Sequence, residues 1–410
     1  MAEVSKRRTA KRAVPARTGA ARTVSSRAFP STTARSTARS TARFTNFEHT
    51  GPGTLAGRFM RSAWQPVHRS QDLPKGRAKP IRILGEDLTL YRGESGAVQL
   101  VAQRCPHRGT QLSAGWVEGD GIRCLYHGWK FSGDGRCVEM PSETDAFAAK
   151  VRIAAYPARE HLGLIFAYLG EGAPPPFPHI PGFEGEGIVE TWVEPFPCNF
   201  FQCWENSFDE YHVQFTHRTG AMHPRFPQLH RMDFEETPYG LLRRSHYPDG
   251  QVHESPFIMP NILRTPVPSP NALQGHGPKL RESYLIKVPV DDENHLFFVT
   301  QQVALKAGEH EGYAKAYEAY LAQRAGARPP HELGLEILAG KLTLLDVKDH
   351  PYLAIIEDVV AQGGQGRIAD RGAERLGRSD VGIIAMRKLW SREMKALAGG
   401  RAPKRWTYPG

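Results

Sequence analysis

The chain has 410 residues, enough for two or three domains with large buried cores. It has no run of about eighteen apolar residues, so no transmembrane helix is predicted. Residues 1–44 hold eleven Lys and Arg against one acid, Glu3, and thus carry the whole formal charge of +10. Because the remainder is neutral, nucleic acid is an improbable partner for the body of the chain.

Residues 1–54 are predicted to form a disordered basic tail, since this stretch is rich in Ser, Thr, Ala and Arg and poor in core-forming residues. Translation from an upstream start codon is one origin of such a tail. The alternatives are an organellar transit peptide and a contact with nucleic acid or an anionic surface. The odd number of cysteines, five, and the lack of a signal peptide favour a reducing compartment, so we expect a cytoplasmic protein of bacterial type.

Residues 55–170 show short strands separated by frequent turns, which predicts an all-β domain. The expected strands are Ile81–Leu84, Leu88–Tyr91, Val98–Ala102 and Leu162–Leu169. Gly133–Arg136 is typical of a hairpin turn. A Pro- and Gly-rich stretch over residues 171–185 indicates a linker to a second domain.

Residues 186–410 mix strands and helices. The expected elements are a strand at Val189–Val193, a helix over residues 198–217, strands at Tyr284–Val290 and His295–Thr300, and an amphipathic helix at Val381–Leu397. Strands framed by helices at both ends favour an α+β domain.

Two motifs in the first domain combine cysteine with histidine. Cys105–Gly109 reads CPHRG, and Cys124–Trp129 reads CLYHGW. Two thiolates and two imidazoles on paired loops are the ligand set of a Rieske [2Fe-2S] cluster. Structural zinc sites usually pair Cys with Cys and His with His, at other spacings. The predicted cluster ligands are Cys105, His107, Cys124 and His127.

A second constellation lies in residues 205–217, which read ENSFDEYHVQFTH. Asp209 and His212 share one face of a helix, whereas His217 lies about 140° away on a regular helix. For both histidines to bind one metal, the helix must end or bulge between them. Two imidazoles suit a non-haem Fe(II) site with two His and one carboxylate, although two structural histidines are the plainer alternative. The neighbouring aromatic residues either line a pocket or belong to the core: Phe208, Tyr211 and Phe215.

Together these motifs resemble the α (terminal oxygenase) subunit of the Rieske non-haem iron oxygenases, closest to the phthalate-dioxygenase-like branch. The resemblance covers about residues 58–398 and includes the segment VPVDD at Val288–Asp292. It implies a Rieske [2Fe-2S] domain over residues 55–170. It also implies a helix-grip-like catalytic domain over residues 186–410, with an antiparallel sheet and flanking helices.

The resemblance further implies a carboxylate ligand far downstream of the two histidines. The segment Ile355–Val360 matches the family pattern best with Asp358 as the ligand, so Fe(II) is expected on His212, His217 and Asp358. The other candidates are Asp346, Asp349 and Glu357.

By the same resemblance, Asp209 bridges the cluster ligand His127 of one subunit to the iron ligand His212 of the next. Such a bridge requires an oligomer, which we expect to be a homotrimer or a multiple of it.

The expected activity is that of a terminal oxygenase. Electrons from NAD(P)H would arrive through a flavin/iron–sulfur reductase. With these electrons and O2, the enzyme would hydroxylate, dihydroxylate or demethylate a small compound. The resemblance implies that this compound is aromatic. Basic residues near the cluster loops either dock an acidic reductase or are ordinary surface charges: Arg104, Arg108, Arg123, Lys130 and Arg136. A carboxylated substrate would need an arginine near the pocket to bind its carboxylate. The candidates are Arg218, Arg243 and Arg244. The alternative function is a Rieske electron-transfer protein with an inactive catalytic domain.

Overall fold

The computed structural model describes residues 45–178, 187–220, 231–270, 273, 275–306 and 308–407. Most of the predicted tail, residues 1–44, lies outside this range. Residues 45–54 differ from the expectation, because Phe47 is buried and stacks on Phe201 with ring centroids 4.3 Å apart. Composition alone does not reveal that one aromatic side chain in a polar stretch is buried. The predicted tail therefore includes residues 45–54 incorrectly.

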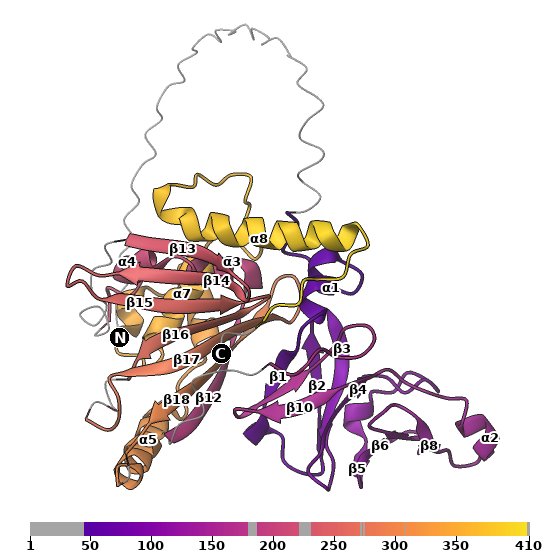
Figure 1. Ribbon diagram of the computed structural model, residues 1–410. Coiled ribbons are helices and arrows are strands. Elements are labelled where there is room, and N and C mark those ends of the chain that lie inside the picture. Colours follow the sequence, from indigo (N-terminus) through magenta and orange to yellow (C-terminus); the bar gives the residue numbers. More distant parts are fainter. Residues whose placement is uncertain are drawn as a thin grey trace, which may run out of the picture. The chain divides into compact units, whose positions relative to one another are not determined.

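The first half of the molecule consists of three antiparallel sheets with strand orders β1-β11-β10, β2-β3-β4-β9 and β5-β6-β7-β8 (Figure 1). Their bounds are β1 (Gln65–Arg69), β2 (Arg77–Ile83), β3 (Glu86–Arg92), β4 (Val98–Ala102), β5 (Trp116–Glu118), β6 (Gly121–Arg123), β7 (Lys130–Ser132), β8 (Cys137–Glu139), β9 (Ala155–Tyr156), β10 (Ala158–His161) and β11 (Leu164–Ala167). The helices here are α1 (Leu55–Arg61) and α2 (Asp145–Ala148). The predicted hairpin turn joins β7 to β8, with Gly135 at φ +84°. The last predicted strand is shorter than expected because Leu162 and Gly163 form the positive-φ turn that enters β11.

The second half is built on one antiparallel sheet in the order β12-β18-β17-β16-β15-β14-β13. The strands are β12 (Gly187–Phe196), β13 (Arg231–Thr237), β14 (Gly240–His246), β15 (Val252–Ile258), β16 (Ile262–Pro268), β17 (Leu280–Pro289) and β18 (His295–Ala304). The helices are α3 (Phe200–Ser207), α4 (Val213–Thr216), α5 (His310–Arg324), α6 (Pro330–Leu338), α7 (Leu353–Gly363) and α8 (Val381–Ala398). Short 3₁₀ turns are η2 (Ser70–Asp72), η3 (Leu112–Ala114), η4 (Glu210–His212), η7 (Leu344–Val347) and η8 (Arg378–Asp380). Within the described part of the chain, no helix has the length and apolar character needed to cross a membrane.

The segment expected to be one helix over residues 198–217 is broken. Helix α3 ends at Ser207, a 3₁₀ turn follows at Glu210–His212, and α4 adds only four residues before His217. The predicted interruption is therefore present: the 3₁₀ turn ends at His212 and α4 ends at Thr216, so the helix stops between the two histidines. A further break lies ahead of His212, after Ser207.

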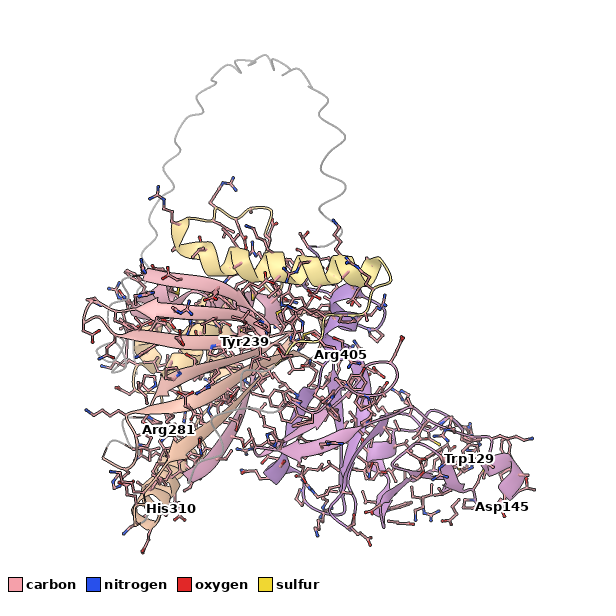
Figure 2. The ribbon with its side chains drawn as sticks, in the orientation of Figure 1. Trp129, Asp145, Tyr239, Arg281, His310 and Arg405 are labelled. Carbon is pink, nitrogen blue, oxygen red and sulfur yellow. The ribbon has the colours of Figure 1, made fainter. Side chains whose placement is uncertain are left out.

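Both halves of the molecule contribute to one hydrophobic core, in which Leu88 and Leu100 of the first half belong with Phe200 and Trp390 of the second. The backbone N–H of Leu84 also donates to the carbonyl of Pro289 at 2.7 Å. The cluster-motif region has a separate small core drawn from residues 78–155. Trp129 and Asp145 mark this region in Figure 2, while Arg281 and His310 mark β17 and α5 of the second half.

Candidate cluster and iron sites

The two cysteine–histidine loops have the same backbone construction. In the first, the N–H of Cys105 donates to the carbonyl of Thr110 at 2.8 Å, and the N–H of Gly109 returns to the carbonyl of Cys105 at 2.9 Å. In the second, Cys124 donates to Trp129 at 2.9 Å and Gly128 returns to Cys124 at 3.1 Å. Gly109 and Gly128 have φ of +76° and +75°, a conformation that glycine adopts at least cost. The loops therefore form a matched pair.

The four predicted cluster ligands divide into an inner and an outer pair. The thiols of Cys105 and Cys124 are buried, whereas His107 and His127 are exposed with ring centroids 4.4 Å apart. Burial raises the pKa of Cys105 to about 11, so a bound cation is needed to hold its thiolate. The ring of Trp129 stacks on His107 at 4.6 Å. Two buried sulfur donors and two outward nitrogen donors fit a cluster with one His-ligated iron at the surface.

In the second half, His212, His217 and Asp358 each offer a ligand atom, and these atoms lie within 4.8 Å of one another. Nε2 of His217 is 3.9 Å from Oδ1 of Asp358. Helix α4 lies between the two histidines and ends at Thr216, and the two imidazole centroids are 5.9 Å apart. Helix α7 contributes the carboxylate. Two imidazoles and one carboxylate fit a divalent non-haem iron.

The Nδ1 atom of each histidine is held by a protein oxygen. His217 Nδ1 is 3.0 Å from Oε2 of Glu357, and His212 Nδ1 bonds to the backbone carbonyl of Asp209. Such partners fix the tautomer and leave Nε2 for a metal. Burial lowers the pKa of His212, which keeps its imidazole neutral. For His217, burial acts downward, but the carboxylates of Asp358 and Glu357 outweigh it and raise the pKa.

Two amide side chains complete the surroundings of Asp358, and sequence reasoning missed both. Asn206 Nδ2 lies 3.5 Å from Asp358 Oδ1 and 3.3 Å from His212 Nε2, while Gln362 Nε2 lies 3.3 Å from the same carboxylate oxygen. Gln362 stands four residues after Asp358, a spacing that places both on one face of a helix. The spacing of four residues could have predicted that Gln362 lies near Asp358. No sequence pattern predicts the position of Asn206.

The rejected carboxylate candidates lie elsewhere. Asp346 accepts from the backbone N–H and hydroxyl of Thr343 as part of a capping box, and Asp349 is exposed. Glu357 is 2 % exposed and contacts Nδ1 of His217 instead of contributing an atom to the group formed by His212, His217 and Asp358.

The aromatic and arginine candidates separate by burial. Phe208 is buried against Phe257 and belongs to the core, whereas Phe215 on α4 is 69 % exposed. Arg218 is exposed, and Arg244 forms surface ion pairs. Arg243 is buried and contacts the turn after α3.

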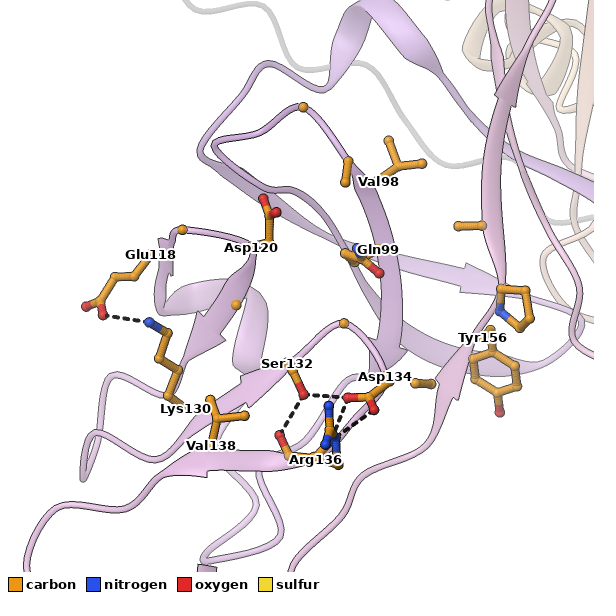
Figure 3. A pocket seen from close by; sticks show the side chains of 18 of the residues that line it. Val98, Gln99, Glu118, Asp120, Lys130, Ser132, Asp134, Arg136, Val138 and Tyr156 are labelled. Carbon is orange, nitrogen blue, oxygen red and sulfur yellow. Dashed lines mark hydrogen bonds and ion pairs between the residues drawn. The ribbon is translucent and has the colours of Figure 1, made fainter. Parts of the chain in front are cut away.

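A groove of about 1150 Å³ lies on the first half, between the β4 region and the strands β6–β8 (Figure 3). Four of its charged residues form two pairs: Lys130 lies 3.7 Å from Glu118, and Arg136 lies 2.7 Å from Asp134. The groove contains none of the predicted ligands, so we do not assign the chemistry to it.

Comparison with known proteins agrees with this geometry. Residues 63–157 match the Rieske [2Fe-2S] domain. The chain is 32 % identical to the 5,5'-dehydrodivanillate O-demethylase oxygenase subunit of Sphingobium sp. strain SYK-6, over 86 % of this chain and 80 % of that protein. It belongs to the Rieske oxygenases.

Within that family this oxygenase is an α subunit of the phthalate-dioxygenase-like branch. It is also 32 % identical to the phenoxybenzoate dioxygenase α subunit of Ectopseudomonas oleovorans, over 86 % of this chain and 84 % of that one. Its fold matches the oxygenase in a reduced complex of oxygenase and ferredoxin from carbazole 1,9a-dioxygenase. The TM-score is 0.63 at 21 % identity, covering 89 % of this chain and 96 % of the other.

These findings confirm the predicted fold class, an all-β Rieske domain with an antiparallel catalytic sheet and helices. They also confirm the predicted enzyme class, a terminal oxygenase with a Rieske [2Fe-2S] domain. The alternative of an inactive catalytic domain receives no support, since these relatives are oxygenases.

Proposed function

We propose that Cys105, His107, Cys124 and His127 hold the [2Fe-2S] cluster and that His212, His217 and Asp358 hold a mononuclear Fe(II). The observation that carries the proposal is the convergence of the last three side chains, from segments 141 to 146 residues apart in sequence, onto one point. When bound there, the iron supplies open coordination positions for O2. The protein's own side chains orient the imidazoles and exclude competing ligands.

We further propose that Asp209 is the electron-transfer bridge. Its backbone carbonyl already bonds to Nδ1 of His212, and burial raises the pKa of its carboxyl. The cluster loops belong to a core that shares no member with the cores that contain residues of α3 and α7. A bridge from Asp209 to His127 of the partner subunit therefore accounts for both sites, with a homotrimer as the assembly.

The external electron source in this proposal is NAD(P)H, delivered through a flavin/iron–sulfur reductase. Of the five basic residues near the cluster loops, Arg123, Lys130 and Arg136 have carboxylate partners. Arg104 donates to the carbonyl of Gly109, and Arg108 lies over the ring of Tyr126. The proposed docking face is thus Arg104 and Arg108 together with the exposed side chains of Leu125 and Tyr126. A cluster reduction rate that ignores ionic strength would contradict it.

The proposed substrate is a small aromatic compound. The names of two relatives contain aromatic compounds: dehydrodivanillate for an O-demethylase and phenoxybenzoate for a dioxygenase. Exposed Phe215 lies on α4, between His212 and His217 in the sequence. Hydroxylation, dihydroxylation and demethylation all use this same ligand set.

Single-turnover product analysis tests the proposal. Chemically reduced protein would be mixed with O2 and a panel of carboxylated, neutral and O-methylated aromatic compounds, and the products read by mass. An oxygenated or demethylated product establishes the activity and its type. No product from any compound, with both metal centres verified, would contradict the aromatic substrate.

A further inference from the structure

Arg243 on β14 is a buried cation that the proposed metal sites do not employ. It is 3 % exposed and stands in a row of buried polar side chains on neighbouring strands. Its Nη2 donates to the hydroxyls of Ser255 at 3.0 Å and Thr265 at 3.1 Å, and these two hydroxyls lie 2.9 Å apart. A buried charge is costly unless it is paired and hydrogen-bonded, so its remaining partners show what it serves.

Those partners are the two ends of the turn that follows α3. Nη1 of Arg243 donates to the backbone carbonyl of Ser207 at 2.7 Å, and Nη2 forms an ion pair with the carboxylate of Glu210. The hydroxyl of Tyr247, which follows β14, donates to the other carboxylate oxygen of Glu210 at 3.3 Å. Only Phe208 and Asp209 lie between the two points that Arg243 holds.

The sequence of the turn lacks the residues that commonly end a helix. Phe208 at the C-cap of α3 has helical φ and ψ, and no glycine or proline follows within the turn. The carbonyls of Trp204, Glu205 and Asn206 accept from the backbone N–H groups of Phe208 and Asp209, which leaves the carbonyl of Ser207 to Arg243. Buried Lys287 adds a second cation at this end of α3, because its Nζ donates to the carbonyl of Cys203 at 3.1 Å and to the hydroxyl of Ser207.

We propose that Arg243 is a positioning residue: it clamps the Ser207–Glu210 turn and thereby aims the carbonyl of Asp209 at Nδ1 of His212. This inference rests on the proposed roles of His212 as iron ligand and Asp209 as bridge. A planar guanidinium suits the task because its rigid fork reaches two acceptors at once, which an ammonium group cannot do in the same geometry.

The same contacts argue against Arg243 as the arginine that binds a substrate carboxylate. Both Nη atoms already donate to protein oxygens, and Glu210 neutralises the charge. Binding a substrate carboxylate would require breaking the clamp.

The test uses the full-length holoprotein with Arg243→Met, which removes the fork and the charge. The readout is the rate at which mononuclear Fe(II) passes to excess ferrozine at low temperature, with cluster absorbance recorded in parallel. We expect Fe(II) release to become about tenfold faster or more, as for the loss of other supports behind metal ligands, at unchanged cluster content. The EPR signal of the nitric oxide adduct of the iron is expected to change shape, because His212 loses its fixed orientation.

Arg244→Met is the matched control, since Arg244 is the next residue on β14 and pairs with Glu235 and Glu254 in solvent. It should behave as the wild type. Arg243→Lys and Glu210→Gln, which keep most of the packing, should each give intermediate release rates and carry the test if Arg243→Met fails to fold. Release within twofold of the wild type in all three variants, with an unchanged nitric oxide signal, would overturn the clamp. Absence of releasable iron from the wild type would instead overturn the proposed iron site.

Discussion

Two adjacent carboxylates on α7 have different tasks. Asp358 lies with the histidine ligands, while Glu357 points to Nδ1 of His217. A helix turns about 100° per residue, so neighbours in sequence reach the same imidazole from different sides.

At this residue scale, Asp358→Ala should lower the mononuclear iron content to about a tenth of the wild-type value or less, because two imidazoles alone hold Fe(II) weakly. The cluster content should not change. Metal analysis with cluster absorbance measures both. Asp349→Ala is the control, as that carboxylate is exposed, and a fully iron-loaded Asp358→Ala would remove Asp358 from the ligand set.

Glu194 on β12 is a second residue whose surroundings make a measurable prediction. Burial raises its pKa from 4.5 to about 7, against the opposing effect of Arg324 and Arg69. The folded state therefore binds this proton more tightly than the unfolded state, so stability is highest below pH 4.5 and falls as the pH rises through 7.

Glu194→Gln should accordingly raise the free energy of unfolding at pH 8 by on the order of 1–3 kcal/mol and change it little at pH 5. Urea unfolding at both pH values gives the comparison, with exposed Glu318→Gln as reference. An equal gain at both pH values would show that the charge of Glu194 is not the cause.

At the scale of elements, the matched cluster loops depend on their glycines to different degrees. A Cβ at Gly128 would lie 3.1 Å from Cγ of Pro141, whereas one at Gly109 would meet nothing within 4 Å. Both positions have positive φ, which costs a non-glycine residue about 1–2 kcal/mol.

Gly128→Ala should thus lower cluster content and melting temperature more than Gly109→Ala, since it adds a contact with Pro141 to the same backbone strain. Absorbance of the cluster per chain and thermal unfolding measure the two effects. Equal losses in both variants would mean that the backbone conformation alone decides.

How far the elements follow from the sequence depends on what stabilises them. The strands Leu88–Tyr91 and Val98–Ala102 can be predicted from their own alternating or apolar residues. The loops CPHRG and CLYHGW indicate a Rieske cluster by their residue types and spacing. The end of α3 at Ser207 contacts Arg243 and Lys287, which come from strands 36 and 80 residues later. No local pattern predicts contacts that are made from another strand.

At the scale of the whole molecule, the cluster loops have a core of their own, separate from the cores that contain residues of α3 and α7. The four proposed cluster ligands and the three proposed iron ligands follow from motif spacing and family resemblance. The amide Asn206 and the clamp Arg243 were not, because their roles arise only when the sheet and α7 meet α3.

The intersubunit bridge predicts complementation between two inactive variants. Cys124→Ser should lack the cluster, and Asp209→Ala should lack the bridge. Coexpressed in one oligomer, they should recover about a quarter of wild-type turnover, since one pairing in four joins an intact cluster to an intact Asp209. Separately purified variants mixed without subunit exchange are the control. No recovery in verified hetero-oligomers would place the electron path within one chain.

The shared core of the two halves also limits how this enzyme can be recombined. Leu88 and Leu100 pack in the same cluster as Phe200 and Trp390, so a chimera cut at the end of the Rieske domain would expose apolar surface on both fragments. The segment between β4 and β9 carries both cluster loops and contributes no residue to the shared core. We therefore expect this segment, rather than the whole first domain, to be the unit that can be transplanted to fit a new electron donor.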